Sequence, residues 1–134
     1  CVLPREHPLA SRDAIDVREL SDDEIITYAP HTAIGMAVGE AFRISGIDIR
    51  KRIQVNYSMT AFVLASRGAG IALVEPLMLA SAQLPMLVAR PLRPRIDVKT
   101  MLLYPRSRAP SRTVSDFMNV LKEEVSWELS TTTD

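Results

Sequence analysis

An uninterrupted apolar run, Gly-Ile-Ala-Leu-Val at residues 70–74, limits the folds that are open to this chain. A strand-length run without polar alternation is typical of a strand covered on both faces, as in a sheet with helices on each side. Gly68 and Gly70 lie between a predicted helix and this strand. A dinucleotide-binding loop needs the opposite order, strand before helix, so a tight turn with glycine at positive φ is the better interpretation.

The remaining segments alternate between strand and helix patterns. Residues 25–29 are β-branched and aromatic and end at Pro30, and residues 53–57 alternate apolar with polar side chains. Two more strands are expected at residues 86–89 and 98–104, on either side of an exposed, proline-bracketed segment. Helices are expected at residues 32–45, 58–68 and 75–82 and after Ser111. This order predicts an α/β fold with a mainly parallel mixed sheet flanked by helices.

Helix boundaries follow from the residues at each end. Thr32 can open the first long helix and Gly46 can stop it, while Ser111 is a plausible N-cap of the last helix. Ser58 is expected to cap the middle helix, whose inner face would be Met59, Phe62, Val63 and Ser66. The polar stretch at residues 11–24 is expected to be a connector with a short helical turn.

Composition and charge narrow the class of protein. The chain has 134 residues, which suits one domain. Its 16 basic and 16 acidic residues balance, so there is no net positive electrostatic field that would attract it to nucleic acid. No apolar run approaches the roughly 18 residues of a membrane-spanning helix, and one cysteine fits a reducing cytoplasm. We therefore expect a cytoplasmic protein whose present segment does not contact DNA or a membrane.

Catalytic and metal-binding patterns are weak. There is no Gly-x-Ser-x-Gly elbow, and His7 and His31 each lie beside a proline. A single cysteine and two separated histidines give no zinc spacing, and the acidic run at residues 22–24 reads as a solvated turn. The arginines and lysine at residues 50–52 read as solvated surface. The sequence thus predicts no enzyme, no metal and no cofactor.

Two strand-to-helix junctions, at residues 28–32 and 56–60, could bind a ligand. Each brings free backbone N–H groups and a hydroxyl to a helix start, and such ends attract carboxylates. The alternative is that Thr32 and Ser58 only cap their helices.

The sequence resembles the effector-binding domain of LysR-type transcriptional regulators over nearly its whole length. The resemblance rests on Leu-Pro-x-x-His-Pro-Leu-Ala at residues 3–10 and on the helix, glycine turn and strand at residues 63–72. Most family members follow that turn with Leu-Pro, whereas this chain has Leu-Val-Glu-Pro-Leu at residues 73–77. That departure and the Val-Ala-Arg-Pro-Leu-Arg-Pro stretch at residues 88–94 resemble the opine-responsive and lysine-biosynthesis regulators.

The resemblance implies a two-lobed domain of the periplasmic-binding-protein type 2 kind. Such a domain closes on a small amino-acid-derived effector, here an opine or amino-acid derivative, and alters how an attached winged helix-turn-helix grips promoter DNA. Residues 13–104 would form the second lobe, and residues 1–12 and 105–134 would belong to the first. Because the chain begins at Cys1 without an initiator methionine, we expect a fragment without the DNA-binding domain and with about half of the cleft.

The same resemblance implies site residues and an assembly. Family members bind effectors between the lobes, which maps onto His31, Thr32, Tyr57, Ser58, Thr60 and Glu75. Helix starts would bind effector carboxylates, and Glu75 a cationic nitrogen, unless Glu75 only begins the next helix. A homodimer or homotetramer is implied, with the helix at residues 32–44 as a candidate contact surface, although its Met36 and Val38 could equally belong to the core. A solute-binding protein of a transport system, which shares the two-lobed architecture, is the alternative.

Overall fold

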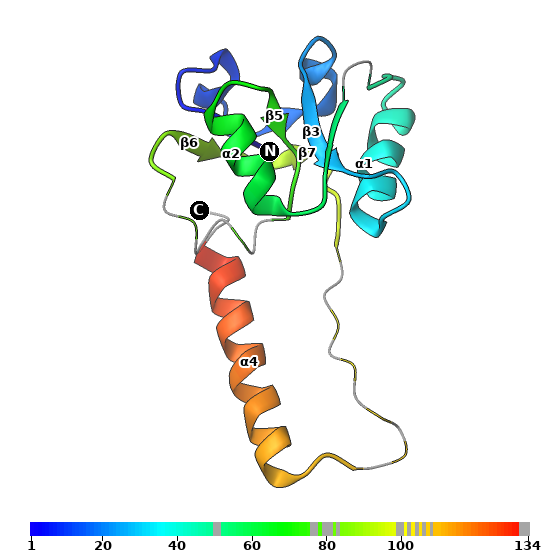
Figure 1. Ribbon diagram of the computed structural model, residues 1–134, viewed down its shortest axis with the longest axis vertical. Coiled ribbons are helices and arrows are strands. Elements are labelled where there is room, and N and C mark those ends of the chain that lie inside the picture. The colour runs from blue at the N-terminus through cyan, green and yellow to red at the C-terminus, as the bar shows by residue number, and fades with distance from the viewer. Residues whose placement is uncertain are drawn as a thin grey trace.

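The computed structural model describes residues 1–49, 52–75, 78, 82, 84–98, 101, 103, 105, 107 and 109–131. Its centre is a five-stranded sheet with the strand order β4-β3-β5-β1-β6 (Figure 1). The strands are β1 (Val2–Pro4), β3 (Ile25–Tyr28), β4 (Arg52–Val55), β5 (Ile71–Ala72) and β6 (Leu87–Ala89). Strand β3 is parallel to β4 and β5, while β1 is antiparallel to β5 and β6. The expected α/β fold with a mixed sheet is confirmed.

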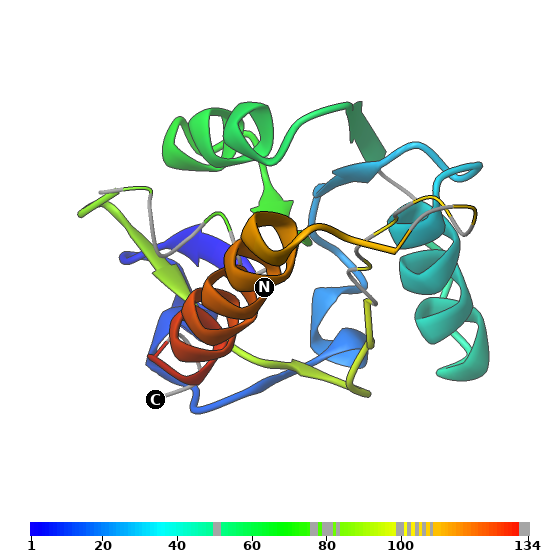
Figure 2. The same ribbon diagram turned by 90° about the horizontal axis from the view of Figure 1, so that it is seen from below.

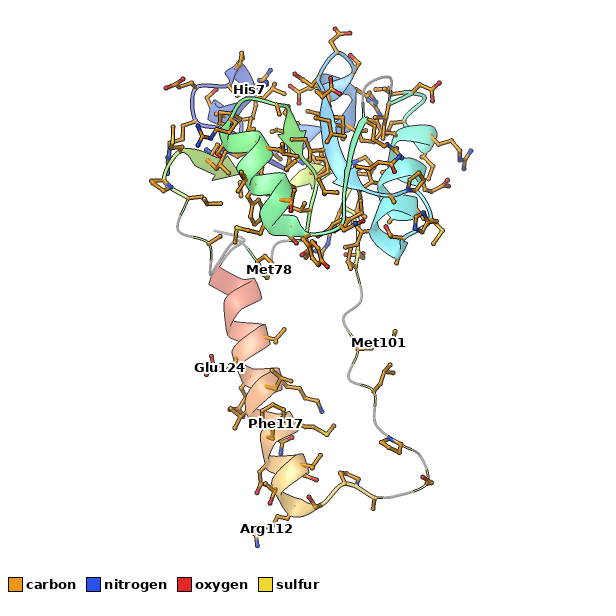
Figure 3. All side chains as sticks on the ribbon, in the orientation of Figure 1. His7, Met78, Met101, Arg112, Phe117 and Glu124 are labelled. Atoms are coloured by element: carbon orange, nitrogen blue, oxygen red, sulfur yellow. The ribbon has the colours of Figure 1, made fainter. Side chains whose placement is uncertain are left out.

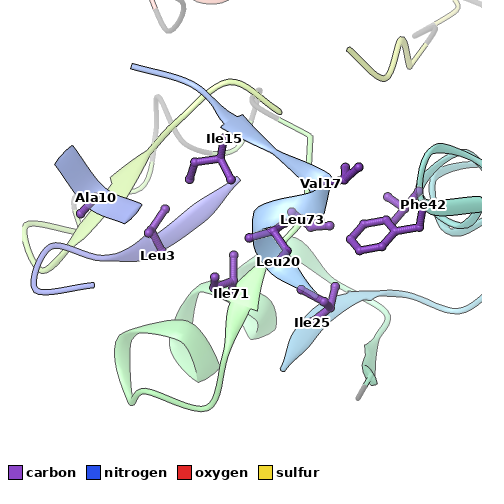
Figure 4. Packing of buried hydrophobic residues seen from close by; sticks show 10 residues of the cluster. Leu3, Ala10, Ile15, Val17, Leu20, Ile25, Phe42, Ile71 and Leu73 are labelled. Atoms are coloured by element: carbon purple, nitrogen blue, oxygen red, sulfur yellow. The ribbon is translucent and has the colours of Figure 1, made fainter. Parts of the chain in front are cut away.

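Side chains that alternate along the central strands pack into two separate buried clusters, one on each face of the sheet. Ile25 and Ile71 belong to the first cluster, together with Phe42 (Figure 4), and the following residues, Ile26 and Ala72, belong to the second. This period-2 alternation with apolar residues at both positions is what a two-sided sheet requires. The apolar run at residues 70–74 therefore has the burial that its sequence predicts.

Helix α1 (Ala33–Ile44) covers the first face together with two short 3-10 helices, η1 (Pro8–Ser11) and η2 (Val17–Leu20). Thr32 caps α1, because its Oγ1 accepts a hydrogen bond of 3.0 Å from the amide of Gly35. Gly46, at φ +74°, follows the helix, so both expected ends are confirmed. Of the two residues suggested for an oligomer contact, Val38 is buried in the core and Met36 is exposed.

Helix α2 (Ser58–Ser66) covers the second face, and here the sequence prediction was wrong by one residue. Its N-cap is Tyr57, which makes no side-chain capping bond, and Ser58 is the first helical residue. The face turned to the sheet consists of Ser58, Ala61, Phe62 and Ala65, whereas Met59 and Val63 are exposed and Ser66 is half-buried. The two small alanines allow the helix to approach the sheet closely, which the larger residues of the expected face would prevent.

The turn between α2 and β5 confirms the interpretation of its glycines. Gly68 has φ +75° and Gly70 has φ +149°, conformations that residues with a side chain rarely adopt. A methyl group on Gly70 would also collide with the backbone carbonyl of Glu24.

Some expected elements differ from the structure or lie outside the described residues. The connector contains the expected helical turn but also β2 (Ile15–Asp16), which pairs in parallel with β7 (Leu92–Arg93) inside the proline-bracketed segment. Where a strand was expected at residues 98–104, the described residues 98, 101 and 103 are not in a strand. Residues 50 and 51 and most of the helix expected at residues 75–82 lie outside the described part.

Strand β1 lies between β5 and β6, within the sheet formed by the segment at residues 13–104. A boundary after Arg12 therefore does not separate two packed units in this structure, and the assignment of segments to lobes stays a prediction.

Helix α4 (Arg112–Thr131) lies below the α/β body in Figure 1 and runs from its distant first turn back toward the body; Figure 2 shows it from below, in front of the body. Ser111 Oγ accepts a hydrogen bond of 3.3 Å from the amide of Val114, which confirms the expected helix start. Phe117 projects from α4 with 64% of its surface exposed (Figure 3). No helix in the described part of the chain is long and apolar enough to cross a membrane.

Gly35 and Gly39 provide a matched test of how α1 packs on the sheet. A methyl group on Gly35 would collide with the carbonyls of Tyr28 and Ala29, whereas a methyl group on Gly39 meets open space. We expect Gly35→Ala to lower the free energy of unfolding by about 1–3 kcal/mol through overpacking. Gly39→Ala should raise it by about 0.5–1 kcal/mol, because alanine has the better helix propensity. Urea unfolding of both variants measures the difference; equal effects would contradict the close packing.

Candidate functional site

The carboxyl ends of the parallel strands β3, β4 and β5 meet at one edge of the sheet, where open α/β sheets bind ligands. From this edge β3 continues into α1, β4 continues into α2, and β5 continues through Leu73 and Val74 to Glu75. The two helix starts and the segment after β5 therefore converge on the same region of the molecule.

Three polar side chains from these elements form a hydrogen-bonded cluster, which we call the Tyr28–Ser58–Glu75 cluster. The Tyr28 hydroxyl donates to Glu75 Oε2 at 2.7 Å and lies 2.6 Å from Ser58 Oγ. Ser58 Oγ donates to Glu75 Oε1 through a short hydrogen bond. Tyr28 and Ser58 are buried, and Glu75 is half-buried. Each hydroxyl thus holds one oxygen of the same carboxylate.

The cluster has few protons for its number of acceptors. An ionised carboxylate contributes about four acceptor sites and no donor, and each hydroxyl contributes one proton and two acceptor sites. Tyr28 and Ser58 each donate their hydroxyl proton to Glu75. No hydroxyl proton then remains for the 2.6 Å contact between the Tyr28 and Ser58 oxygens. A cluster with surplus acceptors is suited to a group that brings donors.

Burial controls the ionisation of Tyr28. Removal of the phenol from water raises the pKa of Tyr28 to about 12. The adjacent Ser58 hydroxyl lowers the pKa of Tyr28, while the hydrogen bond to Glu75 and the negative charge of Glu75 raise it. Tyr28 therefore stays protonated at neutral pH and remains a donor to the carboxylate.

The structure brings two of the residues suggested from the sequence into contact, Ser58 and Glu75. Thr32 acts as a helix cap, and its hydroxyl also donates to the carbonyl of Ala29 at 2.8 Å. His31, Tyr57 and Thr60 are exposed at the two helix starts, outside the hydrogen-bonded cluster.

Tyr28 lies in the junction at residues 28–32 that was suggested from the sequence, but it was not among the individual site residues. Tyr28 is the last residue of the parallel strand β3, and ligands bind at the carboxyl ends of such strands. Its position could therefore have identified it as a candidate site residue. The sequence alone did not reveal its contact with Glu75, which lies 47 residues away along the chain.

Helix α2 begins without a side-chain cap. Within the described residues, the amides of Ser58 and Met59 have no protein acceptor, since the capping side chain is missing and the Tyr57 carbonyl accepts from Thr60 and Ala61. Free amides and the helix dipole make this end attractive to a negative group.

Other candidates for chemistry have structural roles. His7 Nδ1 accepts a hydrogen bond of 3.2 Å from the amide of Leu9, so His7 is a turn residue. Across the part of the chain that the structure describes, no three residues among histidine, cysteine, aspartate and glutamate are grouped to hold a metal ion.

Comparison with known proteins establishes the family. Residues 1–126 match the LysR substrate binding domain, and the chain belongs to this family. Regulatory protein NocR of Agrobacterium tumefaciens (strain T37) is 24% identical over 121 residues, which are 90% of this chain and 40% of NocR. The match to NocR of Agrobacterium fabrum (strain C58) has the same extent. The chain thus spans about two fifths of the length of these curated relatives, and as regulators they do not favour the transport-protein alternative.

Solved structures agree with the family. The BenM effector binding domain with its effector benzoate is 27% identical, with a TM-score of 0.62 over 69% of this chain and 43% of that chain. The regulatory domain of Synechocystis PCC6803 CcmR in complex with 2-PG is 18% identical, with a TM-score of 0.70 over 92% of this chain and 61% of that chain. The chain therefore has the fold of part of a LysR-type effector-binding domain, as expected from the resemblance.

The ionisation of Tyr28 is directly measurable. The difference in phenolate absorbance between the wild type and Tyr28→Phe should titrate near pH 12, because burial holds the proton on Tyr28. The unfolded chain loses this proton near pH 10, so the stability contributed by Tyr28 is present below pH 10 and disappears as the pH rises to 12. Glu75→Gln should lower the midpoint, since it removes a negative charge. Circular dichroism shows whether the protein is still folded at each pH. A phenolate titration midpoint near pH 10 while the protein is folded would contradict the burial of Tyr28 in the cluster.

Proposed function

We propose that this chain provides one wall of the effector cleft of a LysR-type transcription regulator. We propose further that the effector is a small amino-acid-derived molecule, such as an opine or a basic amino acid, and that Glu75 binds its cationic nitrogen. The observation that carries the proposal is the Tyr28–Ser58–Glu75 cluster, a half-buried carboxylate held in place at the ligand-binding edge of the sheet.

The proton count of the cluster favours a cation over an anion beside Glu75. Both hydroxyl protons are already donated to the carboxylate, so the cluster has lone pairs to offer and few donors. An ammonium or guanidinium group brings several donors and a positive charge, and charge-assisted hydrogen bonds are the stronger kind. An effector carboxylate at the same place would face the negative charge of Glu75.

The helix starts are the better places for the negative end of the effector. The free amides of Ser58 and Met59 and the positive end of the α2 dipole favour a carboxylate there. His31, Thr32, Tyr57 and Thr60 surround the two helix starts and would shape this part of the cleft. The BenM domain, whose effector benzoate is a carboxylate, supports an anionic group in the effector.

The function of the full-length protein involves segments other than this chain. We propose that it controls transcription in the cytoplasm, contacts promoter DNA through a winged helix-turn-helix outside this segment, and works as a homodimer or homotetramer without catalysing a reaction. Exposed Met36 and Ile44 on α1 are consistent with a contact surface between subunits. The opine-like subgroup rests on the segments at residues 73–77 and 88–94 and on the likeness to NocR.

Glu75→Gln tests the proposed effector contact. In the complete effector-binding domain we expect this variant to bind opines, arginine or lysine about 10- to 100-fold more weakly, because it loses a charge-assisted interaction of about 1.5–3 kcal/mol. Ser58→Ala should weaken binding less, since Tyr28 still holds the carboxylate. Isothermal titration calorimetry measures the affinities.

Glu40→Gln is the matched control, because Glu40 is exposed on α1 and, among the described residues, pairs with Arg43 alone. It removes the same charge from a different place and should leave the affinities unchanged. Equal losses for the two variants, or unchanged binding by Glu75→Gln, would remove Glu75 from the site.

A further inference from the structure

A polar hollow lies beside strands β1 and β6, which follow β5 at the end of the sheet away from β3 and β4. It has a volume of about 220 Å³ and is lined by Arg5, His7, Ala10, Ser11, Val88 and Arg90. The strand register places the two arginines on the same face of the sheet. Leu3 pairs with Val88, and because β1 and β6 are antiparallel, Arg5 and Arg90 lie two residues beyond this pair in opposite directions and line the hollow from its two ends.

Helix η1 forms the other wall. Ala10 of η1 belongs to the same buried cluster as Leu3 of β1 (Figure 4), which anchors η1 in the core beside the sheet. The hollow is thus bounded by backbone that is anchored in the core.

Main-chain carbonyls position both guanidinium groups. Arg90 donates from Nε to the carbonyl of Ala10 at 3.1 Å and from Nη1 to that of Ala89 at 2.8 Å. Arg5 donates from Nε to the carbonyl of Pro85 at 2.6 Å. Because a guanidinium has five donors, each arginine keeps N–H groups for another acceptor. The arginines are therefore preorganised without being saturated.

Neither arginine has an acidic partner among the described residues, and no acidic residue lines the hollow. By contrast, Arg12, Arg18, Arg43 and Arg95 each pair with a carboxylate. His7, which also lines the hollow, has a carboxylate beside it, since Oδ1 of Asp23 lies 3.5 Å from Nε2 of His7. Since His7 Nδ1 accepts a hydrogen bond, its proton is on Nε2 and faces Asp23.

We infer that this hollow is a binding site for a small oxyanion, a phosphate or carboxylate group, held between Arg5 and Arg90. Guanidinium groups match these oxyanions in geometry as well as charge. The volume suits a single such group rather than a drug-sized ligand, which needs about 300–1,000 Å³. Ser11 can add a hydroxyl donor, and the His7 ring closes one side. This site is separate from the proposed effector cleft and does not depend on it.

The test uses inorganic phosphate and malonate as probes, with sodium chloride at matched ionic strength as the reference. A ligand that binds only the folded state raises the melting temperature in a saturable way. We expect at least one of the two probes to do so and to shift the amide NMR signals of Ser11 and Arg90. Saturation by phosphate alone or by malonate alone identifies the source of the oxyanion group.

Arg5→Gln and Arg90→Gln should each weaken the binding of that probe by about tenfold or more. Arg5→Gln keeps the carbonyl bonds of Arg90 and so serves if Arg90→Gln fails to fold. Arg67→Gln, which removes an exposed arginine at the end of α2, should leave binding unchanged. The site would be overturned if phosphate and malonate changed the melting temperature no more than chloride does, or if the amide NMR shifts were confined to residues 57–60. It would also be overturned if Arg67→Gln lost as much probe affinity as the Arg5 and Arg90 variants.

Discussion

Strands β3 and β5 are buried on both faces, and the positions of the other elements depend on this double burial. Ile25 and Ile71 require cover on one face, which α1 and the 3-10 helices provide, and Ile26 and Ala72 require it on the other, which α2 provides. A shift of register by one residue would exchange the two faces. The pairing of β3 with β4 and β5 therefore determines which residues meet at the carboxyl edge of the sheet.

The Tyr28–Ser58–Glu75 cluster is a consequence of that pairing. Tyr28 ends β3, Ser58 begins the helix after β4, and Glu75 follows β5, so the cluster links all three parallel strands. Buried hydroxyls need partners, and here both find the same carboxylate, which leaves Glu75 oriented and the cluster rich in acceptors. The same contacts that stabilise the edge of the sheet thus prepare it for a cationic group.

Local rules predicted much of the fold and only part of the site. The glycine turn at residues 68–70 and the caps at Thr32 and Ser111 follow from backbone geometry that the sequence carries by itself. Ser58 was misjudged as a cap because its hydroxyl is bound by groups distant in sequence, which a local rule does not see. Tyr28 was missed for the same reason, and the β2–β7 pair joins segments too short to show a strand pattern.

We propose that Glu75, held by Tyr28 and Ser58, contacts the effector. A crystal structure of the complete effector-binding domain with its bound effector tests this most directly. We expect a cationic nitrogen of the effector within hydrogen-bond distance of a Glu75 oxygen, with the effector carboxylate near the start of α2. An effector seated in the cleft with no donor on Glu75 would contradict it.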